Sequence, residues 1–335
     1  MQPVLKLPDA VAQLIEDDAA SIAGQELLKA AAELSRNYRE AVAQPPQITS
    51  QAQRVAYLVA RMPAIFQVNQ LVGLELRRCA PELAVRSVLD LGCGPATATL
   101  AAAQVFGGLE AATLVDRDAQ WLRLSERILA AADARLAESS RFVALDLRLP
   151  IDLGEHDLVV ISYALGELAT PLARIVVERA WALARKAVAV IEPGTPRGFS
   201  TILAARDALI AAHGTIVAPC THAGRCPLDG RDWCHFDTRV DRTQQHQRVK
   251  AGTLPYEIEK YSYVIAAKRV PAEDRRAARI IKHPLKRSGH VILDLCTAES
   301  AAERMVISRR DKDLYRRARA AKWGDLWDPP DRTGT

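Results

Sequence analysis

A chain of 335 residues, 49% hydrophobic and 25% charged, has the composition of an ordinary globular protein and the length of about two domains. These values exclude a disordered tail protein and a fibrous repeat. The net charge of +5 is unevenly spread, because residues 268–319 hold 15 Lys and Arg against 7 Asp and Glu. Such a concentration of positive charge is typical of proteins with a polyanion partner, RNA or DNA.

No segment of the sequence predicts a membrane span. The longest charge-free stretch, 91–109, is interrupted by glycines and polar residues. The N-terminus carries early acids such as Asp9 and Glu16, and we therefore expect neither a secretory nor a mitochondrial type of leader. We therefore predict a cytoplasmic, monomeric protein without a membrane partner, whose six cysteines are thiols or metal ligands rather than disulfides.

The predicted elements fall into four regions. Apolar residues at helical spacing predict helices over about 8–43 and 51–78, separated by Pro45-Pro46. Strands and helices then alternate, which predicts a doubly wound α/β sheet with helices on both faces, a Rossmann-like architecture. The predicted strands are 85–91, 112–116, 141–146, 156–162 and 186–192. We expect an N-terminal helical region (1–80), a Rossmann-like domain (81–212), a cysteine-rich segment (213–236) and a basic β-rich C-terminal region with a closing helix (237–335).

A cofactor signature lies at the end of the first predicted strand. Asp90 precedes a loop containing Gly92 and Gly94, whose backbone can turn sharply and approach a ligand at a helix start. Asp116 ends the second strand, where a carboxylate can accept both ribose hydroxyls, and Asp146 ends the third, where it would face an adenine amino group.

This D-x-G-x-G pattern resembles class I S-adenosylmethionine-dependent methyltransferases over about 85–193. The resemblance implies that Asp90 contacts the methionine end of S-adenosylmethionine, Asp116 the ribose and Asp146 the adenine. The catalytic residue is unknown, because the position after the fourth strand reads Ile161-Ser162-Tyr163-Ala164 and lacks the Asp/Asn-Pro-Pro-aromatic tetrapeptide of base-nitrogen methyltransferases. Tyr163 and Glu167 are candidates for lining the methyl pocket, with packing and helix capping as alternative roles.

Four cysteines form a candidate metal centre. Cys220, Cys226 and Cys234 lie in a Gly- and Pro-rich segment, and Cys296 follows after 61 intervening residues. Four thiolates suit either zinc or an iron–sulfur cluster, and His222 and His235 could replace a thiolate on zinc. The spacing differs from the C-x2-C of zinc ribbons, so four reduced core thiols remain an alternative.

The run APCTHAGRCPLDGRDWCHF, with SYALGEL and IEPGTPRGF before it and GHVILDLC after it, resembles the bacterial and mitochondrial family of methyltransferase-like small-ribosomal-subunit assembly factors. The resemblance covers about 71–327. It implies that Cys220, Cys226, Cys234 and Cys296 hold a [4Fe-4S] cluster and that the protein associates with the small ribosomal subunit through its 16S rRNA.

The leading hypothesis is thus a small-subunit assembly factor that binds rRNA and S-adenosylmethionine and carries a cluster. One alternative is an active rRNA methyltransferase, and another is a small-molecule methyltransferase with a structural zinc. For the rRNA we expect phosphate contacts from basic residues of the second half of the chain. The candidates are Arg225, Arg231, Arg239, Arg242, Lys250, Lys268, Arg269, Lys282, Lys286 and Arg287.

Overall fold

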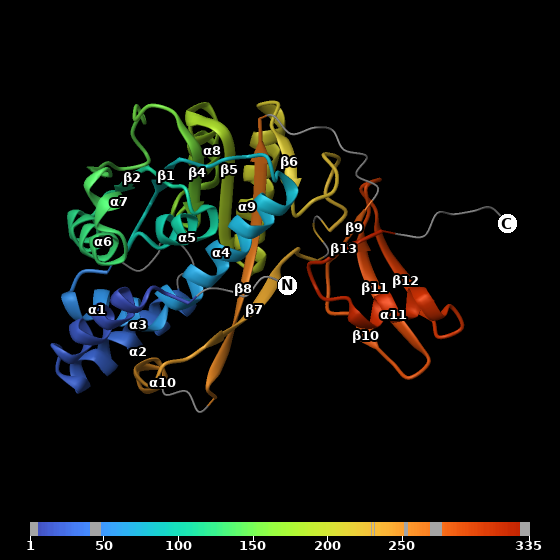
Figure 1. Cartoon of the computed structure of the whole chain (residues 1–335), viewed down its shortest axis with the longest axis horizontal. Coiled ribbons are helices and arrows are strands. Elements are labelled where there is room, and N and C mark those ends of the chain that lie inside the picture. Colours follow the sequence, from blue (N-terminus) through green and yellow to red (C-terminus); the bar gives the residue numbers. More distant parts are fainter. Residues whose placement is uncertain are drawn as a thin grey trace.

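The computed structural model describes most of the chain, namely residues 6–40, 48–228, 230, 232–250, 254–268 and 277–328. Within this part, no helix is both long enough and apolar enough to span a membrane. Four helices come first, and Figure 1 draws α1 to α3 together below the start of the main sheet. They are α1 (Asp9–Ala20), α2 (Gly24–Glu40), α3 (Gln51–Ala60) and α4 (Met62–Cys79).

The predicted helix over 51–78 is broken in two at Arg61. Pro63 lies in the first turn of α4, where its missing N–H costs nothing, whereas inside a continuous helix it would remove a hydrogen bond and clash with the preceding turn. Ser50 and Gln53 form a capping box at the start of α3. The break turns α4 away from α3 and leaves the Arg61 side chain at the edge of the main cavity described below.

The main sheet has eight strands, of which seven follow the order β3-β2-β1-β4-β5-β8-β6, while β7 pairs with β8. Strands β1 to β5 are parallel to one another, and β8 runs antiparallel to β5 and β6. The predicted doubly wound α/β architecture is confirmed by this order. The strands are β1 (Ser87–Leu91), β2 (Ala111–Asp116), β3 (Arg141–Ala144), β4 (His156–Ser162), β5 (Ala184–Pro193), β6 (Thr215–Ala218), β7 (Phe236–Asp241) and β8 (Tyr256–Ala267).

Helices cover both faces of this sheet because successive side chains of a strand point to opposite faces. In β1, Val88 belongs to the core beneath α4 and α5, whereas Leu89 belongs to the core beneath α8 and α9. Both residues are fully buried. The elements around the sheet are α5 (Thr97–Phe106), α6 (Ala119–Ala132), α7 (Ala134–Glu138), the 3-10 turn Leu165–Glu167, α8 (Thr170–Leu183) and α9 (Pro196–Ala211). The short helix α10 (Gln244–Val249) packs against α2 and α3 instead.

A second sheet lies beside the first, at the right of Figure 1. Its order is β10-β11-β9-β13, with β12 paired to β11, and α11 packs on one face around Val291, Leu293 and Ile307. Its elements are β9 (Ala278–Ile280), β10 (Leu285–Lys286), β11 (His290–Cys296), β12 (Ala302–Ser308), α11 (Lys312–Ala320) and β13 (Leu326–Trp327).

The structure divides the region 237–335, which the sequence analysis treated as one unit. Strands β7 and β8 belong to the main sheet, and only the chain from β9 onward forms the second sheet. The physical reason is visible in β8, where Val264, Ile265, Ala266 and Ala267 are all fully buried. A strand that is apolar on both faces needs cover on both sides, and the main sheet supplies it.

Candidate functional site

The glycine loop between β1 and α5 needs its glycines for two separate reasons. Gly92 has φ +79°, and a Cβ added there would lie 2.6 Å from the Cβ of Ala164. Gly94 has φ +48°, with open space around it, so the left-handed backbone alone favours glycine there. The backbone N–H groups of Gly92 and Cys93 donate to the carbonyl of Val115 in β2. The loop is thereby fixed to the neighbouring strand, with the start of α5 beside the cavity.

Asp90 is buried at the end of β1, with 1% of its surface exposed. Its Oδ2 accepts hydrogen bonds from the Thr99 backbone N–H at 3.2 Å and from the Thr99 hydroxyl at 2.8 Å. Burial raises the pKa of Asp90 to about 6. The carboxylate therefore holds the first turn of α5 in place as well as lining the cavity.

Asp116 braces the other side of the same loop. Its Oδ2 accepts from the Gly94 backbone N–H at 3.0 Å, and its Oδ1 accepts from the Asp118 backbone N–H at 2.9 Å. Burial raises the pKa of Asp116. Asp118 in turn forms an ion pair with Arg54 of α3 at 2.7 Å, which ties the N-terminal helices to the rim of the site.

Asp146 lies after β3 with its carboxylate engaged by a neighbour. Both of its oxygens accept hydrogen bonds from the guanidinium of Arg148, and this contact lowers the pKa of Asp146 to about 2. An adenine amino group would therefore share this carboxylate with Arg148.

The structure brings all five predicted cofactor residues to one cavity of about 1620 Å³. The parallel register explains this, because Leu91 pairs with Val115 and Asp116 pairs with Ala144, so that the carboxyl ends of the strands meet at one edge. The residues are Asp90, Gly92, Gly94, Asp116 and Asp146.

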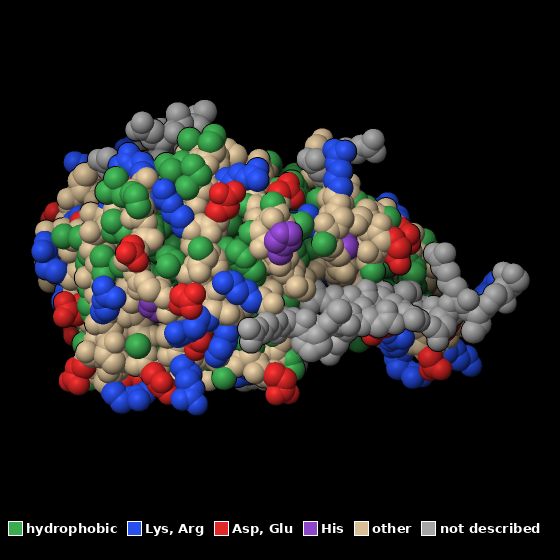
Figure 2. All heavy atoms as spheres, turned by 90° about the horizontal axis from the view of Figure 1, so that it is seen from above, with side chains coloured by type: hydrophobic (Ala, Val, Ile, Leu, Met, Phe, Trp, Pro, Cys, Tyr) green, Lys and Arg blue, Asp and Glu red, His purple; other side chains and the backbone are tan. Residues whose placement is uncertain are grey.

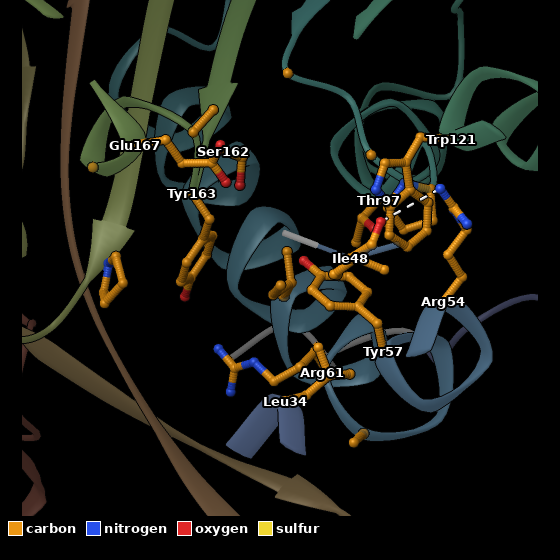
Figure 3. A pocket seen from close by; sticks show the side chains of 18 of the residues that line it. Leu34, Ile48, Arg54, Tyr57, Arg61, Thr97, Trp121, Ser162, Tyr163 and Glu167 are labelled. Atoms are coloured by element: carbon orange, nitrogen blue, oxygen red, sulfur yellow. Dashed lines mark hydrogen bonds between the residues drawn. The ribbon is translucent and has the colours of Figure 1, made fainter. Parts of the chain in front are cut away.

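The N-terminal helices contribute a wall that the sequence analysis did not foresee. In Figure 3, Arg54 and Trp121 lie on one side of the cavity, Tyr57 and Arg61 lie below, and Tyr163 faces them from β4. Tyr57 packs edge-on against Trp121 with ring centroids 5.4 Å apart. These contacts join residues more than 60 positions apart, and no local pattern in the sequence signals them.

Tyr163, Glu167 and Glu192 line the far wall of the cavity, and the first two are the residues that the sequence analysis named as candidates for the methyl pocket. Tyr163 has φ +58°, a left-handed conformation that is rare for an aromatic residue and persists only where the surroundings enforce it. Its hydroxyl donates to Glu259, which also accepts two hydrogen bonds from Arg61 at 3.0 and 3.1 Å. Glu192, 2% exposed, accepts from the N–H groups of Leu165 and Gly166, and burial raises its pKa to about 7.

The four predicted metal ligands line a second, much smaller cavity between the two sheets. Burial raises the pKa of Cys234 well above its usual value and that of Cys296 to about 12, so these thiols are protonated as they stand. Within the described residues, no three or more Cys, His, Asp or Glu side chains are arranged so that they could hold a metal ion. The predicted ligands Cys220, Cys226, Cys234 and Cys296 thus share one cavity without forming a preassembled ion site.

The cavity nevertheless has buried arginines beside the cysteines, of which Arg279 is paired with Glu75 at 2.8 Å. Arg206 and Arg279 line it, and they are only 2% and 3% exposed. The Nε of Arg206 is buried and has no hydrogen-bond partner within the described part of the chain. Its neighbouring carboxylate, Asp207, lies 3.6 Å away with an exposed side chain. A buried guanidinium with an orphaned donor fits thiolates around a metal centre, because such a centre is negative.

Several predicted phosphate contacts are engaged within the protein. Arg242 and Lys250 both pair with Glu257, at 3.1 and 2.6 Å, and line the large cavity. Lys282 pairs with Asp232. Lys286 and Arg287 are exposed at the turn between β10 and β11, and the predicted contacts Arg231 and Arg269 lie outside the described residues.

Comparison with known proteins finds one matching family and relatives that are named ribosome assembly proteins. A family model described as mitochondrial small ribosomal subunit Rsm22 matches residues 51–328. The human ribosome assembly protein METTL17, mitochondrial, is 30% identical over 286 residues, which cover 81% of this chain and 62% of that protein. The Rsm22-cox11 tandem protein 2, mitochondrial, of Schizosaccharomyces pombe is 27% identical over 331 residues, covering 82% of this chain and 43% of that protein. The chain therefore spans less than two thirds of the length of either relative.

Solved structures of methyltransferases are also similar. The magnesium protoporphyrin IX methyltransferase of Synechocystis PCC 6803, solved with bound SAM, is 15% identical with a TM-score of 0.41, covering 70% of this chain and 91% of that one. The fold assignment rests on the strand order given above.

The prediction of a cytoplasmic protein is wrong on this comparison. The matching family and the relatives are mitochondrial by name and point to the mitochondrion. The prediction rested on the first residues of the chain, and these lie before the matched range.

Proposed function

Because the chain belongs to the mitochondrial small ribosomal subunit Rsm22 family, as the resemblance predicted, we propose that it assists assembly of the small ribosomal subunit by binding its rRNA. The human relative is named a ribosome assembly protein. In this proposal the methyltransferase fold binds S-adenosylmethionine, either as a ligand that orders the protein or as a methyl donor.

The observation that carries the cofactor part is the single cavity at the carboxyl ends of β1 to β3. It combines a glycine loop at a helix start, which favours the methionine carboxylate, with Asp116 at the end of β2, which suits the ribose hydroxyls. The neighbouring Thr97 hydroxyl is buried without a partner among the described residues, and it is available to a ligand.

The support for rRNA binding is electrostatic. Lys286 and Arg287 are exposed on the second sheet, within the most basic part of the chain. On the face drawn in Figure 2, Lys and Arg lie among Asp and Glu rather than in one continuous positive field. We expect phosphate contacts from the exposed basic residues of the second sheet.

Binding to small-subunit precursors should weaken steeply with salt, by about 100-fold between 50 and 200 mM if about four phosphates are contacted. Co-sedimentation of purified protein with precursor particles over a salt series measures this. The double variant Lys286→Ala, Arg287→Ala should bind more weakly and with a shallower salt dependence, whereas Arg174→Ala on the exposed face of α8 should match the wild type. Binding that is unchanged by salt, or no binding at all, would contradict the proposal.

We further propose that Cys220, Cys226, Cys234 and Cys296 hold a [4Fe-4S] cluster. The supporting observations are their shared cavity and the two buried arginines beside it. Loading would release thiol protons and would join β11 of the second sheet to the segment that follows β6. The cluster would thereby stabilise the position of the basic sheet against the cofactor domain.

Anaerobically reconstituted wild-type protein should be brown and contain iron and sulfide, and Cys226→Ser should lose most of both. Cys79→Ser is the matched control, because Cys79 ends α4 and does not line the cysteine cavity. Iron and sulfide analysis with visible absorption measures the outcome. A colourless wild type with one zinc per chain would contradict the cluster and support a structural zinc site.

A further inference from the structure

We propose that His222 is a positioning residue that donates an N–H···S hydrogen bond to Cys296 and thereby raises the reduction potential of the bound cluster. This inference rests on the cluster of the proposed function. It concerns a side chain that the sequence analysis considered only as a substitute ligand for zinc. In the structure, His222 contacts the sulfur of Cys296 and does not take the place of a cysteine as a metal ligand.

The geometry of the imidazole carries the proposal. Its Nε2 lies 3.3 Å from the Sγ of Cys296, and its Nδ1 lies 2.9 Å from the hydroxyl oxygen of Ser300. A cysteine that binds iron is a thiolate and can only accept a hydrogen bond, so Nε2 must then carry the proton. Nδ1 is left as the acceptor of the Ser300 hydroxyl. One neutral tautomer thus satisfies both contacts.

The surroundings hold this arrangement from both sides. Ser300 has φ +64°, and an added Cβ at Gly224 would lie 2.1 Å from its hydroxyl oxygen, so the serine closes tightly over that glycine. The buried Arg206 donates to the carbonyl oxygens of His222 and Gly224 at 3.0 and 2.7 Å. A non-glycine residue keeps a left-handed backbone only where its surroundings enforce it. The orientation of the imidazole is therefore built into the loop.

The bond joins two parts of the chain that are far apart in sequence. Cys296 is the last residue of β11, whereas His222 follows Cys220 by two positions. Hydrogen bonds to the sulfurs stabilise the more negative, reduced state of a cluster and are one of the factors that set its potential. Losing this bond should therefore make the cluster harder to reduce.

The test compares reconstituted wild type with His222→Ala, His222→Gln and Ser300→Ala in anaerobic redox titrations followed by electron paramagnetic resonance. We expect His222→Ala to keep its iron and sulfide and to shift the reduction equilibrium about tenfold towards the oxidised state, which is 59 mV for one electron. Ser300→Ala should shift it less in the same direction, and His222→Gln, which keeps an N–H donor, should recover part of the wild-type value.

His235→Asn is the matched control. His235 adjoins Cys234 and is also half-buried, but its ring hydrogen-bonds the backbone oxygen of Trp233 and stacks on the Trp233 ring. An unshifted potential in His222→Ala, or an equal shift in His235→Asn, overturns the inference while the cluster stands. A wild type that takes up neither iron nor sulfide overturns the cluster itself. If His222→Ala does not fold, the shifts of Ser300→Ala and His222→Gln decide in its place.

Discussion

Replacing Arg279 by Met should lower the free energy of unfolding by about 3 kcal/mol or more. Arg279 lies in β9, is 3% exposed, and pairs with Glu75 of α4 at 2.8 Å. Its guanidinium also donates to the backbone oxygens of Pro219 and Gly324. The substitution leaves these oxygens and part of a carboxylate buried without their donor, and such orphaned groups are costly.

Urea denaturation of the wild type and of Arg279→Met measures this loss of unfolding free energy. Arg304→Met is the matched control, because Arg304 makes a two-pronged pair with Asp294 on the exposed face of β12. Exposed pairs contribute less than about 1 kcal/mol, so the control should unfold close to the wild type. If the two variants lose equal stability, the buried arginine does not connect the sheets as its contacts indicate. Because Pro219 precedes Cys220, Arg279→Met should also reduce iron uptake.

Replacing Asp116 by Ala should weaken binding of S-adenosylmethionine by about 100-fold. Hydrogen bonds to a charged group contribute about 1.5–3 kcal/mol each, and the carboxylate is placed to accept from the ribose hydroxyls. The same carboxylate also accepts from the backbone N–H groups of Gly94 and Asp118, so the alanine variant loosens the glycine loop as well.

Isothermal titration with S-adenosylmethionine measures the loss, and Asp116→Asn separates its two causes. The asparagine amide keeps an acceptor for one N–H group but loses the charge. Asp116→Asn should therefore hold the glycine loop better than Asp116→Ala does, while it recovers little of the affinity for S-adenosylmethionine. Glu110→Ala is the control, since Glu110 lies just before β2 at its opposite end and pairs with the exposed Arg86. Equal affinity in Asp116→Ala and wild type would remove Asp116 from the site.

The strands of the main sheet show how far sequence patterns reach. The predicted strand 156–162 coincides with β4, because a short apolar run between turn residues has few other stable conformations. The run that forms β8 lies in the region 237–335, which was predicted to be β-rich, yet the place of β8 between β5 and β6 was not predicted. Strand neighbours depend on which edge of a sheet is available, and that is not written in a local pattern.

The residues of the large cavity also fall into those that the sequence identified and those that it did not. Asp90, Gly92 and Asp116 could be identified from the sequence because each one occupies a fixed position at the end of a strand or in the turn after it. Arg61 could not, because its partner Glu259 is 198 residues away and the contact depends on the helix break at Pro63.

By itself, the sequence determined the order of helices and strands in the α/β domain, the glycine loop with its acids, and the four cysteines with their family. These features are set by residues close together in the chain, where hydrophobic periodicity and backbone sterics act. Only the tertiary structure decided that β8 enters the main sheet, that Arg206 is buried beside the cysteines, and that His222 lies against Cys296. Contacts of this kind form when distant segments bury their apolar surfaces together, and their partners are selected by the packing of the whole chain.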